Sequence, residues 1–195
     1  MRKFLAPLLA ALALSACVAS DASMQVAPAV RDIAVQRMRF AVEAVCLNNR
    51  TRSAQDRAAR ALGFPIRERQ NGATVFVNPN TLTFLRIGPV DAQTYGRPDG
   101  QRGVVRAGTG CSVGSPAVGI RTANQIVGEI LSPRLVEGAP ITARPLGAGV
   151  NAAGGNGFFF RDLAVTMPLA NTSFSDGEGG QTQTFTHPVI LIIHQ

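Results

Sequence analysis

The chain has 195 residues, with 19 Lys and Arg against 12 Asp and Glu, three cysteines and two histidines. This length is enough for one domain with a hydrophobic core. The longest apolar run beyond the N-terminus, Val189–Ile193, has the length of a strand, which excludes a membrane-spanning helix there. His187 and His194 are not at ligand spacing from any cysteine, which argues against a zinc site, and we expect no cofactor.

The first 16 residues have the three parts of a signal peptide for export. Two basic residues precede an apolar run at 4–14, which is shorter than the roughly 20 residues that a spanning helix needs. The run ends in Leu14-Ser15-Ala16-Cys17, and this order resembles the lipobox of bacterial lipoproteins. The resemblance implies lipidation of Cys17, cleavage before it, and attachment of the mature chain to a membrane through its lipids. The alternative is a cleaved signal peptide followed by an incidental cysteine.

The domain organisation follows from this N-terminus. We expect a signal peptide at 1–16, a lipidated cysteine with a short tether of small and polar residues at 17–29, and one globular domain at 30–195. Val18 follows the cysteine in place of Asp, and in the lipoproteins that this segment resembles such a residue favours the outer membrane. The expected location is therefore the bacterial cell envelope, with the domain facing the periplasm.

Two further cysteines, Cys46 and Cys111, remain in the predicted domain. An exported chain with two cysteines in an oxidising compartment is expected to pair them. Closing a loop of about 65 residues stabilises a fold by roughly 4 kcal/mol in the chain-entropy model. The alternative is two buried thiols.

Two helices are predicted before the first strand. Apolar residues at helical spacing predict an amphipathic helix over 28–46, with Pro28 in its first turn and Cys46 on its buried face. The second helix is predicted to begin at Ser53, because Asp56 three residues later completes a capping-box pattern. Gly63 fits the position just after its end.

Strand patterns dominate the rest of the chain, with one helix among them. Pro79-Asn80 is the expected turn of the first hairpin, and Pro133 is expected to stop a helix that begins at Thr122 and runs through Leu131. This order predicts an α+β domain in which N-terminal helices precede a mostly antiparallel sheet with one inserted helix. The last strand is apolar on both faces, which predicts a central place in the sheet. The expected strands are 74–78, 81–87, 103–107, 110–114, 140–144, 157–166 and 184–193, and the expected loops are 91–102, 147–157 and 175–181.

The positive charge is concentrated in the predicted helical region. The nine arginines between residues 31 and 69 are Arg31, Arg37, Arg39, Arg50, Arg52, Arg57, Arg60, Arg67 and Arg69, and only four acidic residues oppose them there. Five of these, Arg31, Arg37, Arg39, Arg57 and Arg60, form a predicted basic helical face. Guanidinium groups bind carboxylates and phosphates with two hydrogen bonds, so the expected partner is an anionic envelope component or protein. Nucleic acid is not an expected partner of an exported chain, and the alternative is a solvated helix face without a partner.

Gly110-Cys111-Ser112-Val113-Gly114 matches the Gly-x-Ser-x-Gly pattern of serine hydrolases. The order of Ser112, then Asp162 or Asp176, then His187 or His194 also matches that of the α/β-hydrolase triad. Two observations oppose this interpretation: Ser115-Pro116 follows where the pattern needs a helix, and no βαβ series precedes it.

The function predicted from the sequence is therefore a membrane-anchored, non-enzymatic envelope lipoprotein with a basic helical face. A small serine hydrolase that uses Ser112 is the first alternative, and a purely structural lipoprotein without a specific partner is the second.

Overall fold

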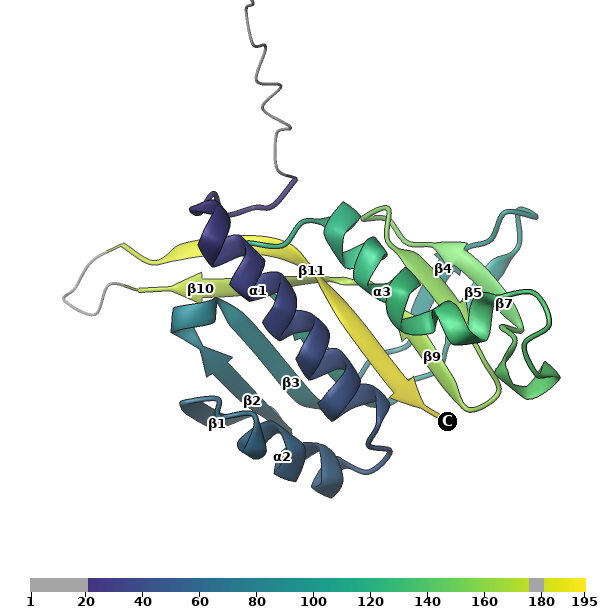
Figure 1. Ribbon diagram of the computed structural model, residues 1–195, viewed down its shortest axis with the longest axis horizontal. Coiled ribbons are helices and arrows are strands. Elements are labelled where there is room, and N and C mark those ends of the chain that lie inside the picture. Colours follow the sequence, from purple (N-terminus) through teal and green to yellow (C-terminus); the bar gives the residue numbers. More distant parts are fainter. Residues whose placement is uncertain (1–20, 176–180) are drawn as a thin grey trace, which may run out of the picture.

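The computed structural model describes residues 21–175 and 181–195, so the predicted signal peptide, Cys17 and Asp176 lie outside the described residues. Helices lie on one face of a curled antiparallel sheet, and the main hydrophobic core fills the space between these two layers (Figure 1). This confirms the predicted α+β fold, with N-terminal helices and one inserted helix. Within the described residues, no helix is long and apolar enough to cross a membrane.

The helical layer begins with α1 (Pro28–Ala41), which continues as a π-helix, η1 (Val42–Leu47). Pro28 occupies the first helical turn as predicted, because its missing N–H would have had no partner there. The next helix, α2 (Arg52–Ala61), is capped by Thr51, whose hydroxyl accepts a hydrogen bond from the N–H of Ala54. The prediction of Ser53 as the cap was therefore wrong by two residues. Gly63 has φ of +70° just after the helix, which confirms its predicted place.

The described residues contain eleven strands, and all their pairings are antiparallel. Their order across the sheet is β1-β2-β3-β6-β11-β9-β8-β7-β4-β5, and β10 pairs with the first half of β11. The strands are β1 (Ile66–Gln70), β2 (Ala73–Asn78), β3 (Thr83–Val90), β4 (Gln93–Gly96), β5 (Arg102–Val105), β6 (Gly108–Gly114), β7 (Gly147–Val150), β8 (Asn156–Phe159), β9 (Leu163–Thr166), β10 (Leu169–Phe174) and β11 (Gln183–His194).

The second half of β11 lies between β6 and β9, which confirms the predicted central strand. Ile190 and Ile192 belong to the core beneath the helices, whereas Leu191 and Ile193 pack with Tyr95 in a second cluster on the other face. The sequence of a strand that is buried on both faces is a continuous apolar run, because neither set of alternate side chains contacts water.

The inserted helix α3 (Ile120–Leu135) starts two residues earlier than predicted and contains Pro133, which was expected to stop it. Pro133 has no N–H to donate to the carbonyl of Glu129, and the hydroxyl of Ser132 donates to that carbonyl in its place at 2.9 Å. The last turn of the helix therefore tolerates the proline.

Several strand predictions were wrong. The segment predicted as a strand at 140–144 contains the short helix η3 (Ile141–Ala143), and the predicted loops at 91–102 and 147–157 contain β4 and β7. The single strand predicted at 157–166 contains parts of two strands, β8 and β9. The sequence patterns did not predict β1, which has one apolar side chain, or β10, in which no side chain is fully buried.

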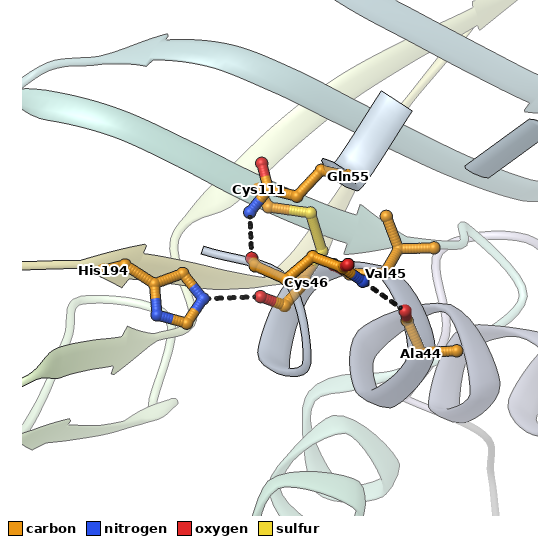
Figure 2. Close-up of a disulfide and its surroundings, with 7 residues drawn as sticks. Ala44, Val45, Cys46, Gln55, Cys111 and His194 are labelled. Atoms are coloured by element: carbon orange, nitrogen blue, oxygen red, sulfur yellow. Dashed lines mark hydrogen bonds between the residues drawn. A yellow bond between two sulfur atoms is a disulfide. The ribbon is translucent and has the colours of Figure 1, made fainter. Parts of the chain in front are cut away.

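Cys46 and Cys111 form a disulfide, as predicted, which joins η1 to β6 with a Cα–Cα distance of 5.3 Å (Figure 2). Both cysteines are fully buried. The ring of His194 donates from Nε2 to the carbonyl oxygen of Cys46 at 2.7 Å, because a carbonyl can only accept. The disulfide and this hydrogen bond fix the end of η1 on the centre of the sheet.

The described part of the predicted tether lies against the domain. The Asp21 carboxylate accepts a hydrogen bond from the N–H of Arg121 at 2.9 Å, in the first turn of α3. The N–H of Met24 donates to the carbonyl of Pro116 at 2.9 Å, and the Ser23 hydroxyl donates to the same oxygen at 3.3 Å. The N-cap of α3 is Gly119, whose lack of a Cβ leaves room for the Asp21 carboxylate. The described residues from Asp21 to Met24 therefore contact the segment that leads into α3.

Candidate anion-binding groove

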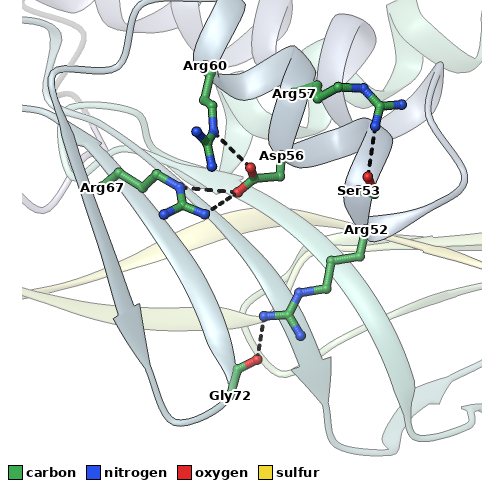
Figure 3. Close-up of polar contacts among 7 residues, drawn as sticks. All are labelled: Arg52, Ser53, Asp56, Arg57, Arg60, Arg67 and Gly72. Carbon is green, nitrogen blue, oxygen red and sulfur yellow. Dashed lines mark hydrogen bonds and ion pairs between the residues drawn. The ribbon is translucent and has the colours of Figure 1, made fainter.

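A hollow of about 670 Å³ lies between α2 and the β1–β2 hairpin (Figure 3). Four of its lining side chains are arginines and one is a carboxylate. The lining residues are Arg52, Ser53, Asp56, Arg60, Arg67, Arg69, Asn71, Gly72, Ala73 and Thr74. We call this hollow the basic groove.

The periodicities of one helix and one strand place these side chains together. Arg52, Asp56 and Arg60 are four residues apart along α2, so they share one side of that helix. Arg67 and Arg69 alternate along β1 and point to the same face of the sheet. Arg67 is paired with Phe76 across the hairpin, and Phe76 belongs to the core beneath the helices, so this is the face that α2 covers.

One end of the groove is neutralised by Asp56. Its carboxylate accepts hydrogen bonds from Arg60 Nε at 2.9 Å and from Arg67 Nη2 and Nε at 2.9 and 3.2 Å. Partial burial on its own would raise the pKa of Asp56, but the hydrogen bonds and charges of Arg67 and Arg60 outweigh it and lower this pKa below its usual range. Two guanidinium groups, one from α2 and one from β1, thus hold one carboxylate.

The other end repeats this arrangement without a carboxylate. Arg52 of α2 donates from Nη2 to the carbonyl of Gly72 at 2.7 Å, in the β1–β2 turn, where φ of +77° suits a glycine. Arg69 of β1 has no hydrogen bond or ion pair from its side chain to another described residue, and the first turn of α2 contains no acidic residue. This end therefore has two guanidinium groups and no counter-charge.

The chemistry of the groove suits an anionic group. Guanidinium groups remain charged at all physiological pH values and bind carboxylates and phosphates with two parallel hydrogen bonds. Within the described residues, no cluster of three or more His, Cys, Asp or Glu side chains could hold a metal ion. The lining of the groove contains no cysteine or histidine.

The structure does not bring the five arginines of the predicted basic helical face together. Arg37 donates to the carbonyl of Leu62 at 3.3 Å, next to α2, whereas Arg39 points to α3 and pairs with Glu129 at 2.7 Å. Arg39 also lies 3.6 Å from Glu43, as expected from their spacing.

The remaining members of that set are also spread. Arg31 lies 3.9 Å from Asp32, and Arg57 donates to the Ser53 hydroxyl at 2.8 Å. Of the five, only Arg60 lines the basic groove. Sequence reasoning did not single out Arg52, Arg67 and Arg69, and the alternation of Arg67 and Arg69 in a short polar segment is the signal that could have found two of them.

The candidate hydrolase residues lie elsewhere. Ser112 and His187 line a hollow of about 170 Å³ on the sheet face away from the helices. The His187 Nδ1 atom lies 3.1 Å from the carbonyl oxygen of Pro188, so it donates, and Nε2 then accepts from the Thr172 hydroxyl at 2.9 Å. Burial lowers the pKa of His187 below its usual range. Both ring nitrogens are therefore engaged by groups other than Ser112.

The other two described candidates of that triad face the helical layer. Asp162 accepts hydrogen bonds from Arg134 and Arg50, and His194 donates to the carbonyl of Cys46. The structure therefore brings one predicted base near Ser112 but places the described acid elsewhere, while Asp176 lies outside the described residues.

Comparisons with known proteins gave no match to this chain, whether with protein-family models, with curated proteins or with solved structures.

Proposed function

We propose that the chain is a lipid-anchored, non-enzymatic binding module of the bacterial cell envelope, and that its basic groove binds an anionic envelope component. The Leu14-Ser15-Ala16-Cys17 sequence supports the anchor through its resemblance to a lipobox. The disulfide between Cys46 and Cys111 supports an oxidising compartment, because such bonds persist outside the reducing cytosol. The outer membrane, with the domain facing the periplasm, is the location that Val18 favours.

The observation that carries the binding role is the unmatched charge of the groove. Four guanidinium groups line it with one carboxylate, and that carboxylate is held by Arg60 and Arg67. Arg69 and Arg52, which donates only to the neutral carbonyl of Gly72, have no carboxylate partner, and like charges kept close without a counter-ion favour the binding of an anion.

A binding measurement with matched charge variants tests this role. The full-length chain, solubilised in detergent micelles, is titrated with fluorescently labelled polyphosphate and with labelled polyglutamate. We expect Arg52→Gln with Arg69→Gln to weaken binding of at least one probe by about tenfold, which corresponds to about 1.4 kcal/mol. The control, Arg31→Gln with Arg57→Gln, removes the same charge outside the groove and should change the affinity less than twofold.

Two results would count against the role of the groove. An equal loss in both double variants would mean that overall charge attracts the probes, and no loss in either would mean that they bind elsewhere. Binding at the groove should also weaken as salt is raised from 50 to 150 mM, because exposed charges are screened more strongly.

The anchor needs a separate test. The full-length chain is expressed in a Gram-negative host that is fed a fatty acid analogue which can be labelled after lysis. We expect label on the chain, and we expect Cys17→Ala to remove both the label and the membrane attachment. An unlabelled chain that fractionates with the soluble periplasm would instead support a plain signal peptide.

A further inference from the structure

The described chain enters the domain at one end of α1. Asp21 contacts the first turn of α3 through the N–H of Arg121, and Met24 contacts the carbonyl of Pro116 just before that helix. Asp21 is the fourth residue after Cys17, and four residues span at most about 14 Å when fully extended. A lipid on Cys17 would therefore hold this end of the domain close to the membrane.

Two helices begin at this end. Arg39 of α1 and Glu129 of α3 are 2.7 Å apart, and each lies between nine and eleven residues after the start of its own helix. Figure 1 shows both helices starting where the described chain begins and running side by side in the same direction.

The basic groove lies toward the other end of α1. This helix has 14 residues and a length of about 21 Å, and η1 continues it. Asn49 follows η1, and its carbonyl accepts a hydrogen bond from the Gln55 side chain at 2.9 Å. The start of α2 therefore lies near the end of η1, away from the start of α1. The Arg37 contact with Leu62 shows that α2 then runs back alongside α1. Arg52 and Gly72 thus lie at the end opposite to the entry of the chain.

The groove also indicates which anion it binds. Arg60 and Arg67, one from α2 and one from β1, hold the carboxylate of Asp56. Arg69 is two residues from Arg67 along β1, and Arg52 is eight residues from Arg60 along α2. This second pair lines the same groove and has no carboxylate. The lining contains no aromatic ring on which a sugar could stack, and β1 is an exposed edge strand along which an extended peptide can lie.

We infer that the groove binds an acidic segment of another protein, which supplies a Glu or Asp carboxylate to Arg52 and Arg69 from the side away from the anchoring membrane. This inference rests on the proposed anchor and binding role. Lipid headgroups of the anchoring bilayer are not the ligand, because the Arg52 end of the groove lies farther from the entry end than the length of α1, about 21 Å. The charge of the bilayer is screened over about 8 Å at physiological salt.

The test compares one chain in two surroundings. The full-length chain is placed in detergent micelles and in vesicles that contain 30 % anionic lipid, and both are titrated with a labelled peptide of alternating Glu and Thr. We expect affinities that agree within twofold between micelles and vesicles. Arg52→Gln with Arg69→Gln should weaken peptide binding at least tenfold in both, and Arg31→Gln with Arg57→Gln should change it less than twofold.

The other outcomes separate this inference from the proposed function. Peptide binding in micelles that is lost in anionic vesicles would show that the groove faces the bilayer and would overturn the inference. Groove-dependent binding of polyphosphate without binding of the peptide would overturn the choice of partner, yet would leave the anionic-ligand role intact. Binding of neither probe would overturn both.

Discussion

Two clusters in this molecule have the same composition, an aspartate held by two arginines. Asp56 is held by Arg60 and Arg67, and Asp162 is held by Arg134 and Arg50 at 3.1 to 3.2 Å. In both, burial alone would raise the pKa of the carboxyl, and the arginines more than offset it, so the pKa is lowered. Local electrostatics therefore does not distinguish them.

Their surroundings differ. Asp162 joins three parts of the chain, the turn between β8 and β9, the end of α3 and the loop after η1. A guanidinium lies over an aromatic ring in both clusters, Arg134 over Phe160 at 5.2 Å and Arg67 over Phe76 at 5.8 Å. Asp56 instead lies beside a hollow of about 670 Å³ with two further arginines. The Asp56 ion pairs are therefore part of a candidate site, because the neighbouring arginines have no carboxylate and the hollow has space for a ligand. The Asp162 cluster is a structural link, and the Asp56 cluster is one side of a groove.

The largest change in the free energy of unfolding should come from loss of the disulfide, which holds η1 on β6. The chain that follows η1 leads to Arg50 and α2, so the disulfide supports both clusters. We expect Cys46→Ala with Cys111→Ala to lower the free energy of unfolding by about 4 kcal/mol, because the loop between the cysteines is long. Chemical denaturation with and without reductant measures this change. A loss below about 1 kcal/mol would mean that core packing alone holds the helical layer.

A smaller change should separate the two clusters. We expect Asp162→Ala to lower the free energy of unfolding by about 2 kcal/mol, because it removes hydrogen bonds to charged groups at a partly buried junction. Binding of the acidic peptide should be unchanged. Thermal denaturation and peptide titration of the same sample check both expectations, and a weakened affinity would show that Asp162 supports the groove.

The opposite pattern is expected from Asp56→Asn. The free energy of unfolding should fall by about 1 kcal/mol or less, because the Asn side-chain oxygen can still accept a hydrogen bond from an arginine and only the charge is lost. Affinity for the acidic peptide should rise by about threefold, since Arg60 and Arg67 become available to the ligand. Asp56 would be a structural residue like Asp162 if its replacement lowered stability strongly and left the affinity unchanged.

The smallest effect is a pH dependence shared by the clusters and His187. The pKa of His187 is lowered in the folded state, so the unfolded chain binds more protons and stability should fall as pH drops below 6.5. The lowered pKa values of Asp56 and Asp162 contribute stability above pH 3.8, and this contribution is lost as pH falls through their folded-state values. Melting temperatures from pH 8 to 2 should show the upper step and the onset of the lower one. His187→Gln should remove the upper step, and Asp162→Ala should reduce the lower one.

The sequence predicts those features of the fold that depend on local patterns. Pro28 and Gly63 mark helix ends, and the apolar run of β11 predicts its central place. The burial of Cys46 is predicted by the helical periodicity of the apolar residues, although the helix continues as the π-helix η1 from Val42. These predictions are confirmed because each rests on neighbours within a few residues of the chain.

The basic groove depends on contacts that local patterns do not contain. The arginine excess at 31–69 is visible in the sequence, but the five residues between Ile66 and Gln70 carry too little apolar character to predict β1. Without β1, no pattern places Arg67 and Arg69 opposite α2. Arg39, in turn, is neutralised by Glu129, which is 90 positions away. Sheet register and helix packing therefore determine which arginine side chains have no acidic partner within the chain.

The most direct test of the groove as a binding site is a nuclear magnetic resonance titration of the full-length chain in micelles with the acidic peptide. We expect shifts of the backbone amides of Arg52, Arg69 and Gly72 that saturate with peptide concentration. The amides of Arg134 and Asp162, in the matched cluster, should not move. Saturating shifts around Arg31 or Arg134, without shifts at Arg52 and Arg69, would contradict the assignment of the groove.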